Sequence, residues 1–146
     1  MVTGAGTGYF PWLPGTAGTL VAVPVSLAFN RIATVSLPLA LLTLGVFFLV
    51  AVWLADKGEE IFREKDSPRI VIDEMAGFVL ANFLAPPQLP AIGAAFLVFR
   101  IFDIIKLFPA ARAEKMAGGV GVVLDDLIAG LYTFMILRLL FFWGVL

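Results

Sequence analysis

An apolar stretch without charge is the feature that most constrains how this chain can fold. No charged residue occurs from Ile32 to Ala55, and Leu39–Ala55 is dense in Leu, Val and Phe. A helix needs about 20 apolar residues to cross the hydrocarbon core of a bilayer, so we interpret this stretch as a transmembrane helix. Charged residues make up only 14% of the chain, whereas a soluble domain carries about 25%. Much of the surface is therefore expected to face lipid.

Further apolar segments predict a bundle around this helix. They lie at Thr19–Phe29, Met75–Ala85, Pro90–Phe99 and Leu127–Leu146. Prolines at positions 86, 87 and 90 separate the middle two segments, which predicts a helical hairpin or, alternatively, a re-entrant one. With polar flanking residues, its helices would run roughly over Ile70–Ala85 and Pro90–Lys106. Glycines before the first segment, including Gly15 and Gly18, predict irregular backbone. We expect one domain over residues 1–146, an all-α polytopic membrane bundle with about five apolar helices, some of them short or re-entrant.

The charges are distributed unevenly along these segments. If the segments cross the bilayer alternately, Asp56–Glu74 and Arg100–Asp126 fall on the same side. These two stretches contain eight of the ten basic residues and all eleven acidic residues. Because cytoplasmic loops carry an excess of Lys and Arg, we expect this side to be cytoplasmic, and any active site built from the acids to lie there.

Two residue types are missing, and their absence restricts the chemistry. The sequence has no Cys and no His, which excludes thiolate and imidazole nucleophiles. Any metal would have oxygen ligands only, which points to Mg²⁺, Mn²⁺ or Ca²⁺. The net charge of −1 gives no indication of nucleic-acid binding.

Two pairs of adjacent acids lie next to apolar segments. Asp73-Glu74 precedes one such segment, and Asp125-Asp126 precedes the last. Carboxylates entering hydrocarbon need a partner or a metal, although acids are also favoured at helix N-termini by the helix dipole. A Gly-rich loop comes before the second pair, with Gly118, Gly119 and Gly121. Its backbone N–H groups could approach a phosphate closely, or the loop could simply be a bend.

Basic and hydroxyl side chains complete the candidate set. Arg100, Asp103 and Lys106 recur every three residues and so lie on neighbouring parts of one helix face. They are candidates for binding phosphate oxygens and a metal, or for anchoring the helix at the interface. Thr16 and Thr19 are expected to cap the first helix, whose N-terminus could also bind phosphate.

Four blocks of this sequence resemble those of the bacterial phosphatidylglycerophosphatase A family. The matching residues are Pro14–Thr19, Asp66 with Ile70–Glu74 and Gly77, Phe99–Lys106 with Pro109, and Gly118–Asp126 with Ala129-Gly130. The chain departs from the family pattern at Leu107, where a Pro is expected, and at Ala117, where some members carry His. The resemblance implies an Mg²⁺-dependent phosphatase in the bacterial cytoplasmic membrane, which removes the terminal phosphate of phosphatidylglycerophosphate to give phosphatidylglycerol.

We therefore predict an active site at the cytoplasmic interface, in which water, or a carboxylate that becomes transiently phosphorylated, attacks the phosphorus. The predicted metal ligands are Asp73, Glu74, Asp125 and Asp126. The predicted catalytic residues are Asp66, Asp73, Asp103 and Asp126. The predicted phosphate-binding residues are Thr16, Thr19, Arg100, Lys106, Gly118, Gly119 and Gly121. The expected partners are a phospholipid substrate and the membrane, while the oligomeric state stays open. A small metal or ion transporter and a non-catalytic membrane subunit are the alternative functions.

Overall fold

The fold, taken from a computed structural model, is described for residues 3, 6, 14–64, 67–113, 116 and 118–146. In these ranges the helices are α1 (Pro14–Val35), α2 (Leu37–Phe62), α3 (Ile72–Ala81), α4 (Leu89–Ile105), α5 (Ala110–Ala113) and α6 (Gly119–Phe142). No strand occurs among them. The predicted all-α fold is confirmed.

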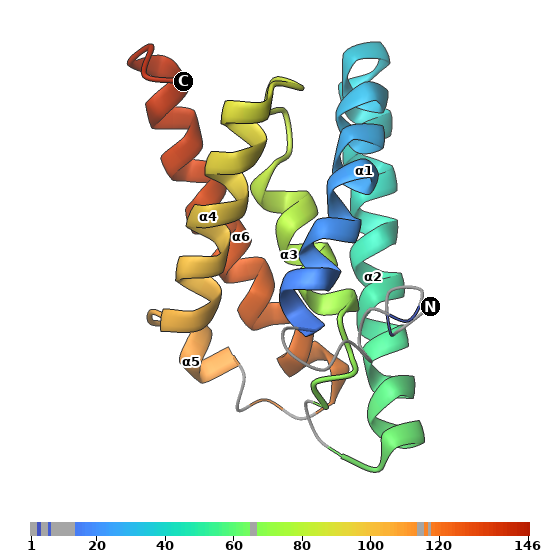
Figure 1. The fold of residues 1–146 in the computed structure, drawn as a ribbon. Helices are drawn as coiled ribbons and strands as arrows, with labels where there is room; N and C mark the ends of the chain where they lie inside the picture. The colour runs from blue at the N-terminus through green and yellow to red at the C-terminus, as the bar shows by residue number, and fades with distance from the viewer. Residues whose placement is uncertain (1–2, 4–5, 7–13, 65–66, 114–115, 117) are drawn as a thin grey trace.

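The five longer helices alternate in direction (Figure 1). In that view the chain runs up α1, down α2, up α3, down α4 and up α6. Three helices, α1, α2 and α6, are long and apolar enough to cross a membrane. By contrast, α3 has only 10 residues, or about 15 Å, which is half the thickness of a hydrocarbon core. The expectation of short helices in the bundle is therefore confirmed.

The hairpin between α3 and α4 forms where the prolines predicted it. Irregular backbone inside a membrane protein needs internal hydrogen-bond partners, and Asn30 on α1 supplies them. Its Nδ2 donates to the carbonyl oxygens of Asn82 (2.8 Å) and Ala85 (3.2 Å), and its Oδ1 accepts from the N–H of Leu84 (2.7 Å). The short helix α3 is thus held at its C-terminal end by α1.

Two expectations about helix boundaries were wrong. Gly15 and Gly18 belong to α1 and not to irregular backbone, because they serve close helix contact: a Cβ at Gly18 would lie 2.8 Å from Val71 Cβ. The last helix begins at Gly119 and not near Leu127. The Gly-rich segment is therefore the first turn of α6 and not a preceding loop.

Small residues form much of the core, while large apolar side chains point outward. Ala22, Ala51, Ala55, Ala76 and Ala95 are each 0% exposed. Large residues such as Leu49, Leu89 and Phe142 are 72%, 86% and 84% exposed. Membrane helices pack through small residues and present large apolar ones to lipid, so this distribution fits a bundle surrounded by lipid.

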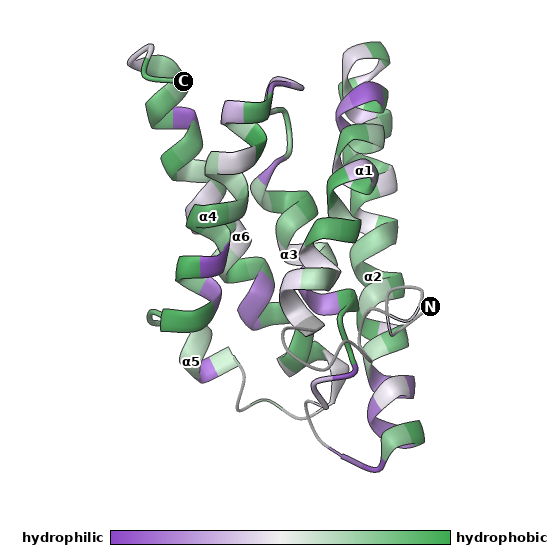
Figure 2. Ribbon diagram, in the orientation of Figure 1, coloured by the Kyte–Doolittle hydropathy of each residue, from purple (hydrophilic) through white to green (hydrophobic). Residues whose placement is uncertain are grey.

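Hydrophilic residues gather at one end of the bundle. Figure 2 shows them concentrated at the lower ends of α2, α4 and α6 and at the start of α3. Because the helices alternate, the starts of α1, α3 and α6 meet the ends of α2 and α4 at this end (Figure 1). The charged segments, far apart in the sequence, are thereby brought together as the topology predicted.

Candidate active site

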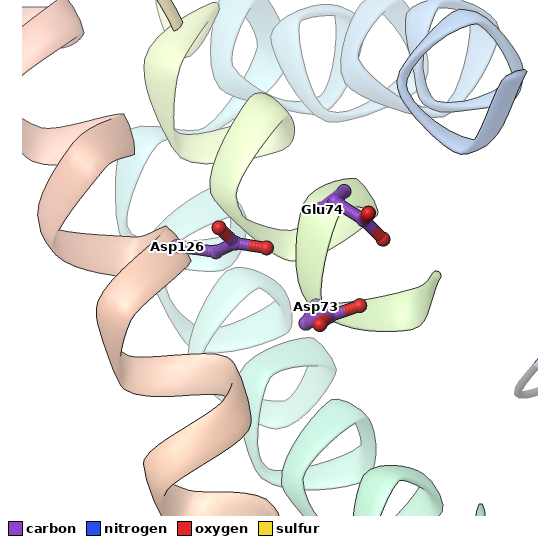
Figure 3. A group of neighbouring side chains, drawn as sticks. All are labelled: Asp73, Glu74 and Asp126. Carbon is purple, nitrogen blue, oxygen red and sulfur yellow. The ribbon is translucent and has the colours of Figure 1, made fainter. Parts of the chain in front are cut away.

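Three carboxylates from two helices form the centre of the site. Asp73 and Glu74 lie in the first turn of α3, and Asp126 lies two turns into α6. One oxygen of each lies within 4.8 Å of the others, and Figure 3 shows Asp126 reaching from α6 towards the start of α3. Asp73 and Asp126 are only 6% and 4% exposed. Three acids so close together, two of them buried and Glu74 half-buried, need a compensating positive charge.

Glycine contacts between α3 and α6 make this approach possible. A Cβ at Gly77 would lie 2.6 Å from the backbone carbonyl oxygen of Asp126, and a Cβ at Gly130 would overlap the carbonyl oxygen of Gly77. At these positions the two backbones touch directly, which only glycine permits. The separation of α3 and α6, and hence the spacing of the carboxylates, is fixed by these contacts.

Arg100 and Asp103, near the end of α4, border the carboxylates. Arg100 Nη1 donates to Asp103 Oδ2, and their side chains are 19% and 13% exposed. Arg100 also lies beside Glu74 at the first turn of α1. A Cβ at Gly15 would overlap Glu74 Oε1 and lie 3.2 Å from Arg100 Nη1. Absence of a side chain at Gly15 therefore leaves room for an arginine and a carboxylate together.

The chemistry of the carboxylate group fits a divalent cation. Glu74 Oε2 is buried and accepts no hydrogen bond within the described residues. Glu74 lies on α3, outside the three spanning helices. Its burial, together with the negative charge of Asp126, raises the pKa of the Glu74 carboxyl to about 8. A cation with oxygen ligands would both complete the coordination of Glu74 Oε2 and relieve the repulsion between the acids.

Asp125 lies outside this group, although it neighbours Asp126 in sequence. Its Oδ2 accepts from Lys106 Nζ at 2.8 Å, and its side chain is only 6% exposed. Successive residues of a helix point about 100° apart, so the two acids of α6 face different neighbours. Lys106 is the residue at which α4 ends, with φ of 47°, and it thereby ties α4 to α6.

The predicted phosphate-binding glycines lie where α6 meets α2. Gly118 has φ of 71°, and a Cβ at Gly119 would lie 2.5 Å from the backbone N of Asp56. The N–H of Gly119 donates to Asp56 Oδ1, and the N–H of Gly121 donates to Gly118 O at 2.9 Å. These amides are thus used within the protein. The phosphate-binding role of the glycines stays a prediction beside this packing role.

The two threonines of α1 differ in their surroundings. Thr19 is fully buried, and its hydroxyl donates to Gly15 O at 2.8 Å inside the helix, so it does not cap α1 as expected. Thr16 is half-buried in the first turn. Asp66 lies outside the described residues. Sequence reasoning missed Asp56, because nothing marks it among the charged residues that follow α2's apolar stretch.

The comparison with protein families decides among these interpretations. A model described as phosphatidylglycerophosphatase A matches residues 1–141. The chain belongs to the phosphatidylglycerophosphatase A family. This membership identifies it as a phosphatase, and it confirms the resemblance found in the four sequence blocks.

Three relatives cover nearly all of the chain. A protein of Bacteroides thetaiotaomicron, provisionally named a phosphatidylinositol-3-phosphatase, is 39% identical, covering 92% of this chain and 87% of its own length. Phosphatidylglycerophosphatase A of Haemophilus influenzae is 28% identical, with coverages of 98% and 88%. Phosphatidylglycerophosphatase A of Escherichia coli is 31% identical, with coverages of 91% and 77%. No solved structure gives a significant match.

Proposed function

We propose that this family member is an Mg²⁺-dependent phosphatase that hydrolyses phosphatidylglycerophosphate to phosphatidylglycerol at the cytoplasmic face of a bacterial inner membrane. The observation that carries the proposal is the buried group of Asp73, Glu74 and Asp126 beside Arg100. The names of the H. influenzae and E. coli relatives support the substrate. The excess of Lys and Arg at the end that holds the acids supports the orientation.

Asp73, Glu74 and Asp126 would hold the Mg²⁺ ion. Their oxygens are within reach of one another, and carboxylates are the ligands this hard cation prefers. When bound, the ion supplies positive charge that polarises the phosphate and acidifies water. Asp125, predicted as a further ligand, is less suited because it pairs with Lys106.

The cations of α4 are placed to bind the phosphate group. Arg100 has five N–H donors, of which Nη1 serves Asp103, so donors are left for phosphate oxygens. Lys106 donates to Asp125 and carries the second positive charge at the end of α4. The N–H groups of the first turn of α1, around Thr16, would add to this site, since helix N-termini favour anions.

The reaction requires a proton acceptor as well as charge neutralisation. The oxygen of water forms a bond to phosphorus, the bond from phosphorus to the glycerol oxygen breaks, and the glycerol oxygen gains a proton. Asp103 is our candidate for accepting the proton of water and for passing it to the glycerol oxygen. A general base has to lie within hydrogen-bond reach of the proton that it accepts. Asp103 is oriented by its hydrogen bond from Arg100, and its charge lies close enough to Glu74 and Asp126 to interact with both.

Phosphate release by the purified protein tests the proposal. Three lipids are compared with Mg²⁺ and with EDTA: phosphatidylglycerophosphate, phosphatidic acid and phosphatidylinositol 3-phosphate. The last is included because of the name of the B. thetaiotaomicron relative. We expect Mg²⁺-dependent release from the first lipid, and loss of release in Glu74→Gln. If phosphate were released preferentially from phosphatidylinositol 3-phosphate, that lipid would replace phosphatidylglycerophosphate as the proposed substrate. Undiminished phosphate release in EDTA would refute the requirement for Mg²⁺.

The transporter interpretation is disfavoured by the position of the acids. A permeation site would be expected near the bilayer midplane, whereas these acids gather at one end of the bundle (Figure 2). Metal flux into proteoliposomes without phosphate release is the result that would favour a transporter.

A further inference from the structure

Within the described part of the chain, the end of the bundle away from the carboxylates has arginines but no acids. All eleven acidic residues lie between positions 56 and 126, and those that the structure describes belong to the helix ends that form the charged end. Arg31 lies 17 residues into α1, or about 25 Å along it, and Arg138 lies near the end of α6. Among the residues that the structure describes, no acidic side chain is therefore placed to neutralise either arginine at this end.

The two arginines differ in the contacts that their guanidinium groups make with the protein. Arg138 donates from Nη2 to the carbonyl oxygen of Phe83 at 3.4 Å and lies 5.2 Å and 5.0 Å from the ring centres of Phe134 and Phe141. The partners of Arg138 within the protein are thus a carbonyl group and two aromatic rings. Arg31 is exposed, and its guanidinium makes no ion pair, hydrogen bond or ring contact among the described residues.

A cavity of about 520 Å³ opens beside Arg31. One wall is a face of α1 that includes Leu27, Arg31 and Thr34, and the other is the Leu84–Pro87 turn. Residues spaced three and four apart share one helix face, so the guanidinium lies on the same face as the apolar wall. The volume is within the range of about 300–1,000 Å³ that is usual for ligand pockets.

The polar groups of the cavity wall are largely used within the protein. Asn30 also lines the cavity, but both ends of its side chain amide bond to the backbone of residues 82, 84 and 85. What the cavity offers a ligand is thus an apolar surface and one unneutralised cation. At the end of a membrane bundle, where lipid headgroups and acyl chains meet, an apolar surface beside a cation matches a molecule with a long apolar part and an anionic head.

We propose that this cavity binds an anionic phospholipid of the leaflet opposite the active site, with its phosphate on Arg31 and an acyl chain along Leu27 and the Leu84–Pro87 turn. Charge-assisted hydrogen bonds from arginine to phosphate favour this arrangement. A zwitterionic lipid is disfavoured because its ammonium group finds no acidic partner at this end among the residues described. The bound lipid would contact both α1 and the α3–α4 turn, and would add to the hydrogen bonds by which Asn30 already links them.

Lipid binding to the detergent-purified protein tests the proposal. Phosphatidylglycerol, phosphatidylcholine and glycerol phosphate are titrated separately, and binding is followed by native mass spectrometry and by the midpoint of thermal unfolding. We expect phosphatidylglycerol to bind, phosphatidylcholine to bind more weakly, and glycerol phosphate, which has no acyl chain, to give no shift. Arg31→Gln should weaken phosphatidylglycerol binding about tenfold, the equivalent of about 1.4 kcal/mol, and Arg31→Lys should restore part of it.

Matched variants separate this cavity from the active site. Arg63→Gln removes an exposed arginine at the charged end and should bind phosphatidylglycerol like the wild type. Phosphate release should be unchanged in Arg31→Gln, which also shows that the variant is folded. The proposal is overturned if Arg31→Gln binds phosphatidylglycerol as well as the wild type does, if Arg100→Gln and not Arg31→Gln abolishes binding, or if phosphatidylcholine binds equally well.

Discussion

The carboxylate of Asp56 near the end of α2 accepts a hydrogen bond from the backbone N–H of Gly119, the first residue of α6. The first N–H groups of a helix have no partner within the helix, and a side chain of the same segment usually caps them. Here the cap comes from a helix 63 positions away in sequence. Asp126 lies seven residues after Gly119 and therefore on nearly the same face of α6. Asp56 thus fixes the start of the helix that carries Asp126.

Replacing Asp56 should both destabilise the protein and disturb the carboxylate group of Asp73, Glu74 and Asp126. We expect Asp56→Ala to lower the free energy of unfolding by about 1–2 kcal/mol, as for the loss of a helix cap, and to raise the Mg²⁺ concentration needed for half-maximal activity. Asp56→Asn should fall between, because its side chain oxygen still accepts. The measurements are thermal unfolding and an Mg²⁺ titration of phosphate release. Glu60→Ala, an exposed acid on the same helix, is the control, and an equal loss in that variant would argue against the role of Asp56.

The glycine contact between α3 and α6 should be sensitive to a single methyl group. A Cβ at Gly130 would overlap the carbonyl oxygen of Gly77, so Gly130→Ala has to push α6 away from α3. We expect a loss of about 1–3 kcal/mol in stability from overpacking. A displacement of about 1 Å in a catalytic site can cost about 100-fold in rate, and a loss of that size is expected in phosphate release.

Gly93→Ala provides the matched control for Gly130→Ala. Gly93 lies within α4, and a Cβ there would meet no heavy atom within 4 Å. The substitution should leave activity intact and stabilise the helix, because alanine is favoured over glycine in helices by about 1 kcal/mol. If both alanine variants behaved alike, the close contact of α3 with α6 would not be what positions the carboxylates.

The sequence was informative where composition and charge decide the structure. The uncharged stretch to Ala55 and the prolines at 86, 87 and 90 predicted the apolar helices and the hairpin, because burial of backbone in lipid leaves few alternatives to a helix. Alternation of these helices then predicted that Asp73 and Asp126 would share one end. The structure confirms this proximity, and the family comparison confirms the resemblance.

The sequence was misleading where tertiary contacts override local preference. Gly18 and Gly119 were interpreted as loop residues, since glycine favours turns, but both lie in helices that approach a neighbouring backbone closely. Such contacts depend on residues far away in sequence, such as Val71 for Gly18. The different neighbours of Asp125 and Asp126 could likewise not be predicted from the sequence. They follow from the inclusion of both residues in α6.

The orientation of the bundle can be tested by labelling, because the chain has no cysteine. Single cysteines at Lys57 and Arg31, both exposed, are compared in intact cells with a thiol reagent that does not cross the membrane. We expect Arg31→Cys to react from outside the inner membrane and Lys57→Cys to react only after the membrane is opened. The reverse pattern would place the carboxylates on the outer side and contradict the proposed cytoplasmic active site.

The two neighbouring acids of α6 should give different results on neutralisation, which the sequence alone does not predict. Asp126 belongs to the three-carboxylate group, so Asp126→Asn is expected to lower the rate of phosphate release on the order of a thousandfold, as for the loss of several kcal/mol of transition-state stabilisation. Asp125 pairs with Lys106. Asp125→Asn should therefore lower the rate of phosphate release only about 10–100-fold, the usual effect of losing a residue that orients the side chains of a site without binding the metal itself.

Steady-state kinetics and a double variant check this difference. If Asp125 acts through Lys106, the variant Asp125→Asn with Lys106→Ala should lose little more activity than the more damaging single variant, because contacting residues are not additive. Asp126→Asn with Lys106→Ala should show nearly the product of the two single losses. Equal loss in the two single aspartate variants, with partial rescue of Asp125→Asn by raised Mg²⁺, would instead assign Asp125 to the metal ligands.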